Sequence, residues 1–228
     1  MNNNKMPVLS FVLAFAVASP ILHAEATLKA GKEKSSACAG CHGENGNSMV
    51  STFPKLAEQH ASYLLKQLQA FKDGSRSDPM MSSIAQNLND EESGEIAAFY
   101  STQKISDNAM PALNTDQDDD DEQADQVKPN ANVTIQTLMA RGSDLYRNGD
   151  LTLEVSACIA CHGPHGEGNR PAAFPSIKSQ HADYLIKTLK DFKSGARSNN
   201  PDNIMHMIAK KMTDEEIKAV SYYISMMK

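Results

Sequence analysis

The sequence predicts an all-α protein built from two similar domains, related by internal duplication and joined by an acidic linker. Three observations support this prediction. Residues 36–43 return in recognisable form at residues 156–163, apolar residues at helical spacing recur at matching places in both halves, and no convincing β-strand alternation appears. A chain of 228 residues is long enough for two domains of ordinary size.

The first 24 residues have the pattern of a secretory signal peptide. Lys5 is the only charged residue before Glu25, and the run Val8–Ala18 is apolar. This run is shorter than the roughly 20 residues of a membrane-spanning helix, and no later stretch is long or apolar enough to replace it. We therefore expect cleavage after Ala24 and a soluble, periplasmic mature protein; the alternative is an uncleaved membrane anchor.

The duplication extends over most of both halves, with an offset of 120 residues that grows to 121 and then 124 through short insertions. The matching segments are Phe53-Pro54 with Phe174-Pro175, Gln59-His60-Ala61 with Gln180-His181-Ala182, Phe71-Lys72 with Phe192-Lys193, and Met81 with Met205. We therefore assign residues 25–107 to an N-terminal domain and residues 133–228 to a C-terminal domain that shares its fold.

The connecting segment, residues 108–132, contains one basic and seven acidic side chains and almost no large apolar ones. It cannot bury enough surface to order itself, so we interpret it as a linker. Its run Asp118–Glu122 does not match a calcium-binding EF-hand loop, because Asp121 stands where that loop requires glycine. Neither half carries a basic stripe, so we expect no nucleic-acid binding.

Helix signals occur at equivalent places in the two halves. Apolar spacing predicts the central helix of each half, which a glycine then stops, and a capping-box pattern opens the last helix of each half. The predicted elements are helices around 27–35, over 63–71 before Gly74 and from the box 89–92 in the first half, and around 135–147, over 184–192 before Gly195 and from the box 213–216 in the second.

All four cysteines lie in two Cys-x-x-Cys-His motifs, which are Cys38, Cys41 and His42, and Cys158, Cys161 and His162. This spacing is typical of c-type haem attachment. Two thiols on one helical turn can form thioethers to the two vinyl groups of a porphyrin, and the adjacent histidine then reaches the iron. A redox dithiol would need a βαβ context that is absent here, and a four-cysteine zinc site would have to unite pairs 120 residues apart. We predict two covalently bound haem c groups.

The second axial ligand of each iron has to come from elsewhere in its half. The candidates are Met80 or Met81 in the first half and Met205 or Met207 in the second, and the repeat alignment selects Met81 with Met205. A methionine on an apolar helix edge is otherwise a core filler.

His60 and His181 also repeat in register and would be the ligands of a bis-histidine alternative with lower potentials. We interpret each as the polar first residue of the following helix, hydrogen-bonded near a haem edge. His165 and His206 have no counterpart in the other half, so we expect them to be surface residues.

The motifs of both halves resemble those of the dihaem cytochromes c4, periplasmic electron carriers with two domains similar to class I cytochromes c. The resemblance is carried by residues 38–43, 53–56 and 63–68 in the first half and by 158–162, 166–169 and 172–175 in the second. It implies axial pairs of His42 with Met81 and of His162 with Met205. The long acidic linker departs from the family pattern.

The resemblance implies an electron carrier that is not an enzyme. It also implies redox partners such as a membrane quinol-oxidising complex and a terminal oxidase or reductase, with loose association at the membrane surface. Two other functions remain. A dihaem peroxidase would need one iron without its methionine, whereas both halves offer one; a cytochrome subunit of an exported flavoprotein dehydrogenase would have the same two-domain design.

Overall fold

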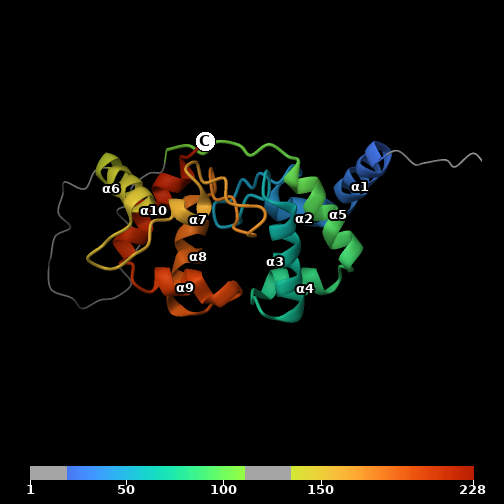
Figure 1. The fold of residues 1–228 in the computed structure, drawn as a ribbon. Helices are drawn as coiled ribbons and strands as arrows, with labels where there is room; N and C mark the ends of the chain where they lie inside the picture. Colours follow the sequence, from blue (N-terminus) through green and yellow to red (C-terminus); the bar gives the residue numbers. More distant parts are fainter. Residues whose placement is uncertain (1–19, 111–134) are drawn as a thin grey trace, which may run out of the picture.

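The computed structural model describes residues 20–110 and 135–228, which form two helical lobes lying side by side (Figure 1). The described residues contain helices and two isolated β-bridges but no strand, so the all-α prediction is confirmed. Most of the expected signal peptide and the acidic run Asp118–Glu122 lie outside the described residues. None of the helices in the described part combines the length and the apolar character that crossing a membrane requires.

The N-terminal lobe is built around a core of Leu64, Ile96, Phe99 and Tyr100. Helix α1 packs along α5, and α3 packs against both α4 and α5. The elements are α1 (Pro20–Lys34), α2 (Ser36–His42), α3 (Ala61–Asp73), α4 (Pro79–Gln86) and α5 (Asp90–Ser101).

The C-terminal lobe repeats this arrangement, with α6 along α10 and α8 against α9 and α10. Its core contains Leu145, Tyr146, Leu185, Ile217 and Val220. The elements are α6 (Ile135–Asn148), α7 (Ile159–His162), α8 (Ala182–Ser194), the 3₁₀ turn η1 (Pro201–Asn203), α9 (Ile204–Ala209) and α10 (Asp214–Ser225).

Several helix ends lie where the sequence predicts them. Helices α3 and α8 stop at Gly74 and Gly195, which both adopt the left-handed conformation. Reciprocal capping boxes open α5 at Asn89 and α10 at Thr213. Helix α1 differs, because it begins at Pro20 and so runs through the expected cleavage point after Ala24. The short helices α4 and α9 are not among the predicted elements, although Asp78 followed by Pro79 is a start signal for α4.

Each lobe has one very close helix–helix contact, at a glycine on its first helix. A Cβ atom on Gly31 of α1 would lie 2.1 Å from the carbonyl oxygen of Glu95 in α5. A Cβ atom on Gly142 of α6 would lie 2.1 Å from the carbonyl oxygen of Ala219 in α10. Only glycine allows the two backbones to approach this closely.

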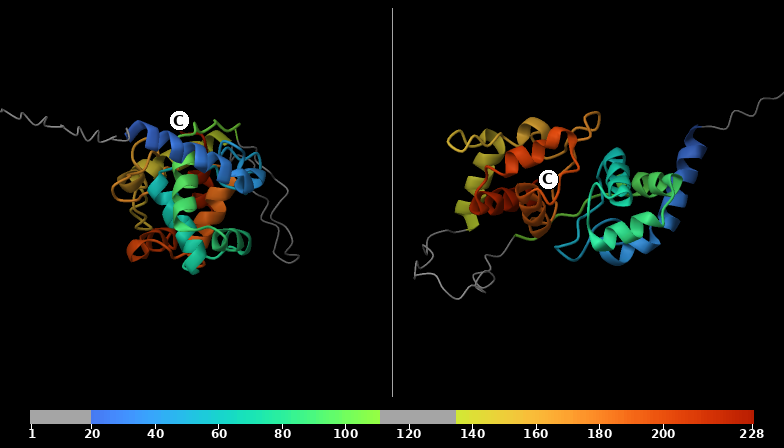
Figure 2. Two further views of the ribbon diagram at one scale, coloured as in Figure 1. Left: turned by 90° about the vertical axis from the view of Figure 1, so that its right-hand side faces the viewer. Right: turned by 90° about the horizontal axis from the view of Figure 1, so that it is seen from below.

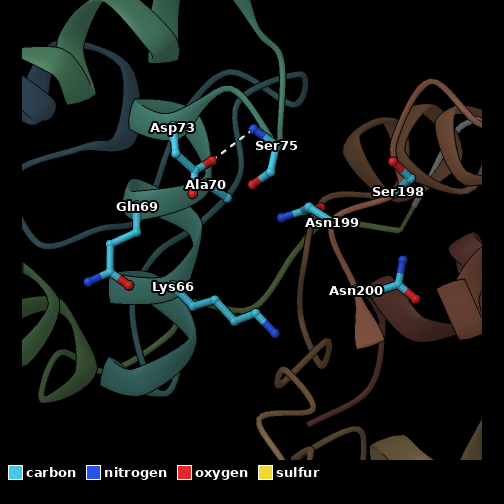
Figure 3. A pocket seen from close by; sticks show the side chains of 8 residues that line it. All are labelled: Lys66, Gln69, Ala70, Asp73, Ser75, Ser198, Asn199 and Asn200. Carbon is cyan, nitrogen blue, oxygen red and sulfur yellow. Dashed lines mark hydrogen bonds between the residues drawn. The ribbon is translucent and has the colours of Figure 1, made fainter. Parts of the chain in front are cut away.

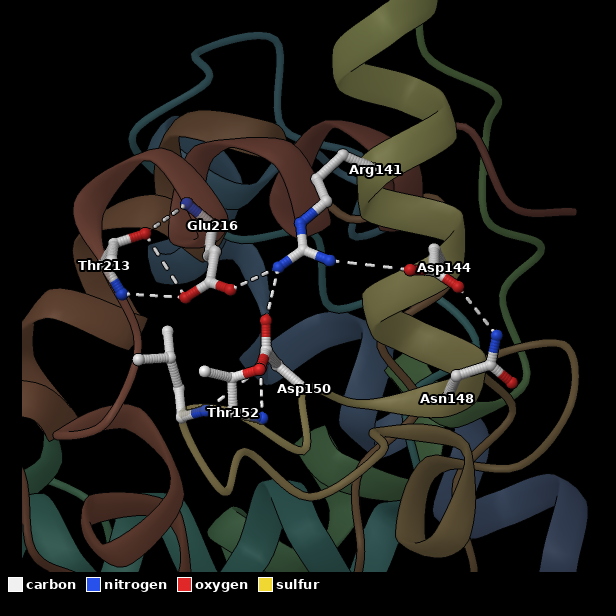
Figure 4. Close-up of polar contacts among 8 residues, drawn as sticks. Arg141, Asp144, Asn148, Asp150, Thr152, Thr213 and Glu216 are labelled. Carbon is white, nitrogen blue, oxygen red and sulfur yellow. Dashed lines mark hydrogen bonds and ion pairs between the residues drawn. The ribbon is translucent and has the colours of Figure 1, made fainter.

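An insertion in the C-terminal lobe forms a hairpin of residues 149–155 between α6 and the cysteine motif. Arg141 of α6 holds this hairpin by donating to Asp150 at 2.7 Å and to the buried carboxylate of Glu216 in α10 at 2.6 Å (Figure 4). Glu216 also accepts the backbone N–H of Thr213 at the start of α10. The hairpin is therefore fixed to both packed helices, while Leu151 at its tip remains exposed.

The two lobes, which Figure 2 shows from two further sides, are joined by reciprocal hydrogen bonds. The side-chain amide of Gln59 donates to the Ser176 carbonyl at 2.7 Å and accepts its N–H at 3.0 Å. At the equivalent place, the amide of Gln180 donates to the Lys55 carbonyl at 2.9 Å and accepts its N–H at 2.8 Å. All four residues are buried, so the interface has the two-fold character of a symmetric dimer.

The residue that leads out of the N-terminal lobe is also held against the C-terminal lobe. The side-chain amide of Asn108 donates to the carbonyls of Ser179, Gln180 and Ser225, at 2.9 to 3.1 Å. Asn108 is the first residue of the expected linker, so the described beginning of that segment is in contact with the C-terminal lobe.

Candidate haem sites

Each cysteine motif forms a short helix that ends directly after its histidine. The next residue, Gly43 or Gly163, has a φ near +80°, and its N–H still bonds back to the helix. A residue with a side chain would be strained here, so the glycine after each histidine is what turns the chain away. The four cysteines are free and half-buried, which leaves the thiols reachable by a porphyrin edge. Burial raises the pKa of Cys38 and raises that of Cys158 to about 11.

The two motif histidines are buried and oriented in the same way. Nδ1 of His42 lies 2.8 Å from the carbonyl oxygen of Pro54, and Nδ1 of His162 lies 3.0 Å from that of Pro175. A carbonyl can only accept, so Nδ1 carries the proton and Nε2 keeps its lone pair for a metal. Burial lowers the pKa of both histidines despite the bond to the proline carbonyl, which favours the neutral ring that can bind iron.

The proline carbonyls are positioned by a turn that recurs in both lobes. The carbonyl of Gly46 accepts the N–H groups of Leu56 and Ala57, at 2.7 and 3.0 Å. The carbonyl of Gly166 accepts those of Ile177 and Lys178 in the same way. These two hydrogen bonds to one carbonyl hold the Phe-Pro segment over the cysteine motif, so a histidine and a proline that are 12 or 13 residues apart come together.

The methionine candidates differ in exposure. Met80 and Met207 are 51% and 48% exposed, whereas Met81 and Met205 are half-buried. Asp78 caps α4 by accepting the N–H groups of Met80 and Met81, and Asn200 accepts the N–H of Met205. The pair selected by the repeat is therefore the better shielded pair.

The other histidines have different roles. His60 and His181 are the N-cap residues of α3 and α8, as the sequence suggests. Each ring lies near residues of the opposite lobe, His60 near Arg170 and His181 near Ser48. His181 Nε2 donates to the carbonyl of Ser48 at 2.9 Å. His165 is exposed as expected, but His206 is half-buried and its Nδ1 donates to the carbonyl of Phe192 at 2.7 Å. The absence of a repeat partner was therefore a poor guide for His206.

Sequence reasoning missed the polar residues that join the lobes. The apolar spacing over 63–71 and 184–192 includes Tyr63 and Tyr184, but each accepts a hydrogen bond from an arginine of the other lobe, Arg197 or Arg76. In the sequence, Gln59 and Gln180 stand out only as matching members of the repeat. Each of these pairs recurs at an offset of 121 residues, so paired polar positions in the alignment were the available signal.

Each lobe contains residues that could hold a covalent haem: two half-buried thiols, a buried imidazole with a free Nε2, and a half-buried methionine on a later short helix. Nothing in this set fits a tetrahedral zinc site, because the two cysteine pairs belong to different lobes. A small helical domain with this motif and this proximal histidine defines a c-type cytochrome domain, here present twice.

Comparisons with known proteins agree. The cytochrome c family model matches residues 28–127 and 139–228. A cytochrome c4 of Pseudomonas aeruginosa is 38% identical over 90% of both chains. The crystal structure of reduced recombinant cytochrome c4 from Pseudomonas stutzeri superposes with a TM-score of 0.75 at 36% identity, covering 88% of this chain and 98% of that one. A thiosulfate dehydrogenase electron acceptor of Stutzerimonas stutzeri is 36% identical, over 83% of this chain and 78% of its own length.

The chain belongs to the cytochrome c family and, within it, to the dihaem cytochromes c4. It is accordingly an electron carrier with covalently bound haem c, and it exchanges electrons with redox partners rather than acting as an enzyme itself.

Proposed function

We propose that the protein is a periplasmic, high-potential carrier with two haems, the first ligated by His42 and Met81 and the second by His162 and Met205. The observation that carries this proposal is the repeated arrangement of a buried histidine with Nδ1 committed to a proline carbonyl and a half-buried methionine on the next short helix. Cys38 and Cys41, and Cys158 and Cys161, form the thioethers. The signal-like residues 1–24 support export.

Haem iron bound in this way supplies one-electron transfer between the ferrous and ferric states. The histidine and the methionine of each lobe would stay bound in both oxidation states, so little reorganisation would accompany each transfer. The proline carbonyl fixes the tautomer and orientation of each histidine. Ligation by the methionine sulfur and burial of the haem would both disfavour the extra positive charge of ferric iron. Both would therefore raise the reduction potential of the haem.

The far-red absorption spectrum of the oxidised holoprotein tests the ligation. We expect the weak sulfur-to-ferric-iron charge-transfer band at an intensity that corresponds to two haems. Met81→Ala and Met205→Ala should each remove about half of it, whereas Met80→Ala and Met207→Ala, the exposed neighbours, should leave it unchanged. A wild-type band of half strength would mean that one iron is open or bis-histidine ligated, and an enzymatic or low-potential role would then be favoured.

For the partners, we propose a membrane quinol-oxidising complex as donor and a terminal oxidase or reductase as acceptor, with loose association at the membrane surface. The similarity to thiosulfate dehydrogenase electron acceptors favours a second candidate, in which an exported dehydrogenase is the donor. Mixing the oxidised protein with a thiosulfate dehydrogenase and thiosulfate distinguishes the two. Reduction within the enzyme's turnover time would support the second candidate, and no reduction would leave the quinol-oxidising complex as the donor.

A further inference from the structure

The turn that follows the cysteine motif is held differently in the two lobes. In the C-terminal lobe, the hydroxyl of Tyr146 on α6 donates to the carbonyl of Gly163 at 2.6 Å, directly after His162. The same turn is closed by the N–H of Gly168, which donates to the carbonyl of His162 at 2.8 Å. A side chain from the first helix of the lobe therefore binds the backbone next to the motif histidine.

The N-terminal lobe has no equivalent of this side-chain bond. Gly31 and Gly142 make the same close helix contact, and the residue four positions later is Ser35 in one lobe and Tyr146 in the other. In the described part of the N-terminal lobe, the carbonyl of Gly43 accepts the backbone N–H of Gly46 at 3.0 Å and no side-chain donor. The turn after His42 is therefore closed by backbone contacts alone.

The N-terminal lobe carries its own buried tyrosine on the other helix of the pair. Tyr100 of α5 stands where α10 has Ile224, by the offset of 124 residues that also relates the facing residues Glu95 and Ala219. Tyr100 and Tyr146 are both fully buried, and each belongs to a core cluster against which the first cysteine of its motif packs. The two lobes therefore place the same kind of side chain near the cysteine motif, but from opposite helices.

The two tyrosine hydroxyls differ in their hydrogen bonds. Within residues 20–110 and 135–228, the hydroxyl of Tyr100 has no partner, because the nearby hydroxyl of Ser35 donates to the carbonyl of Lys32 at 2.9 Å. The hydroxyl of Tyr146 has the short bond to Gly163. A hydroxyl can hold a segment in place only when it bonds to that segment, so only Tyr146 restrains the turn of its lobe.

Full burial makes this restraint strong. Polar side chains between the lobes can reach water, as in the hollow of about 340 Å³ between α3 and residues 198–200, which Lys66 and Asn199 line from opposite sides (Figure 3). The side chain of Tyr146 has no exposed surface, and the ring of Tyr223 packs against it at 5.7 Å between centroids. A shift of the turn would leave the buried hydroxyl without its partner, which costs more than an average hydrogen bond contributes.

The restrained turn bears directly on His162. The ring of this histidine is oriented by the contact of Nδ1 with the Pro175 carbonyl, and its backbone carbonyl is held by Gly168. Tyr146 fixes the next residue as well, so His162 is held through both its side chain and its backbone. Contacts that orient a metal ligand from outside influence the metal centre itself.

We propose that Tyr146 is a positioning residue of the second haem site: its hydroxyl fixes the turn behind His162 and thereby the orientation of the imidazole on the iron. The first haem site lacks this restraint. The inference rests on the proposed function, because it needs His162 to be an axial ligand. It makes the two sites unequal although their cysteine motifs match.

Proton NMR of the oxidised holoprotein tests the proposal, because the paramagnetically shifted haem methyl resonances depend on the orientation of the axial ligands. Met81→Ala and Met205→Ala assign these resonances to the first or the second haem. Tyr146→Phe, which removes only the hydroxyl, should shift the methyl resonances of the second haem and leave those of the first unchanged. Tyr100→Phe, the matched removal of a hydroxyl without a partner, should leave both sets unchanged.

A second variant separates the hydrogen bond from the packing. Tyr146→Ser combined with Ile224→Tyr gives the C-terminal lobe the residues that the N-terminal lobe has at these two positions. A buried tyrosine is kept while the donor to Gly163 is lost, so we expect the second-haem resonances to shift as they do in Tyr146→Phe. Wild-type resonances in either variant would overturn the proposal, and so would an equal shift at the first haem in Tyr100→Phe.

The far-red band of the wild-type holoprotein keeps this result apart from the test of the ligation. A band below two-haem strength would contradict the proposed ligation, on which the role of Tyr146 depends. A band at two-haem strength with unshifted resonances in Tyr146→Phe would contradict only the role of Tyr146.

Discussion

At the scale of single residues, two glutamine amides connect the lobes through buried hydrogen bonds to the backbone. Gln59 and Gln180 each satisfy one backbone N–H and one carbonyl of the opposite lobe, in a place that water does not reach. Their own Oε1 atoms also accept the N–H of the next residue, His60 or His181, which fixes the rotamer. A buried polar backbone group left without a partner costs more than an average hydrogen bond contributes.

Gln59→Ala should therefore lower the free energy of unfolding of the holoprotein by about 1–3 kcal/mol, because the backbone of Ser176 loses both partners. Urea denaturation followed by circular dichroism measures this. Gln69→Ala, at an exposed glutamine on the following helix α3, is the control and should change stability by less than about 0.5 kcal/mol. Equal stability of the two variants would show that the amide contributes nothing to the interface.

The haem-attachment residues could be predicted from the sequence because thioether chemistry dictates both their type and their spacing. The arginine–tyrosine contacts could not, since nothing local distinguishes a tyrosine that faces a helix core from one that faces a second lobe. Tyr63 and Leu64 are neighbours with the same apolar periodicity, yet one lies in the interface and the other in the core. That difference arises only from how the two lobes dock.

At the scale of helices, the contacts α1 with α5 and α6 with α10 depend on glycine. Alanine in a helix interior is normally more favourable than glycine by about 1 kcal/mol. At Gly31 and Gly142 the added methyl group would overlap the backbone of the facing helix, so replacing glycine with alanine should here destabilise the protein.

We expect Gly31→Ala and Gly142→Ala each to destabilise the protein by about 1–3 kcal/mol, since the helices must move apart to admit the methyl group. Gly94→Ala in α5 is the matched control, because a Cβ atom there meets nothing within 4 Å; this variant should be up to about 1 kcal/mol more stable. Thermal unfolding of the three variants gives the comparison. A stabilised Gly31→Ala variant would mean that α1 and α5 are not in close contact.

The helices that the sequence predicts best are those with a chemical signal at each end. Capping boxes and the stop glycines located α3, α5, α8 and α10. Helices α4 and α9 are only 8 and 6 residues long, too short to establish a period, and the start of α9 follows two residues with positive φ, Asp202 and Asn203. Helix α4 nevertheless has a local start signal, the capping Asp78 followed by Pro79, whereas α9 has no side-chain cap and its position follows from packing against α8.

At the scale of the whole molecule, the docking of the lobes should respond to pH through His60 and His181. Burial lowers the pKa of both rings, and nearby positive charge lowers it further, from Arg170 at His60 and from Lys55 at His181. Hydrogen bonds to backbone groups of the opposite lobe and, at His181, the charge of Asp183 act in the opposite sense without reversing the shift. A lowered pKa in the docked state means that docking favours the neutral ring. The stabilisation is complete above the ordinary histidine pKa of about 6.5 and is lost as the pH falls through the lower value in the docked state.

Acidification from about pH 7.5 to about pH 5 should therefore loosen the docked lobes, which sedimentation velocity of the holoprotein detects as a smaller sedimentation coefficient. His60→Gln and His181→Gln remove the titrating groups and should flatten this dependence. His165→Gln, at an exposed site outside the interface, should leave it unchanged. A pH profile that is the same in all three variants would assign the effect to other groups.

The reciprocal hydrogen bonds between the lobes have a consequence for the direction of electron flow. A junction with two-fold symmetry conducts equally well either way, so the paired glutamines cannot make the protein a rectifier. Any preferred direction has to come from positions where the copies have diverged. Examples are Gln67, whose Oε1 accepts hydrogen bonds from both Arg76 and Arg197 while Thr188 stands at the equivalent place, and the hairpin 149–155 of the C-terminal lobe. The duplication therefore accounts for a symmetric path between the lobes, and residues that differ between the copies account for any direction of flow along it.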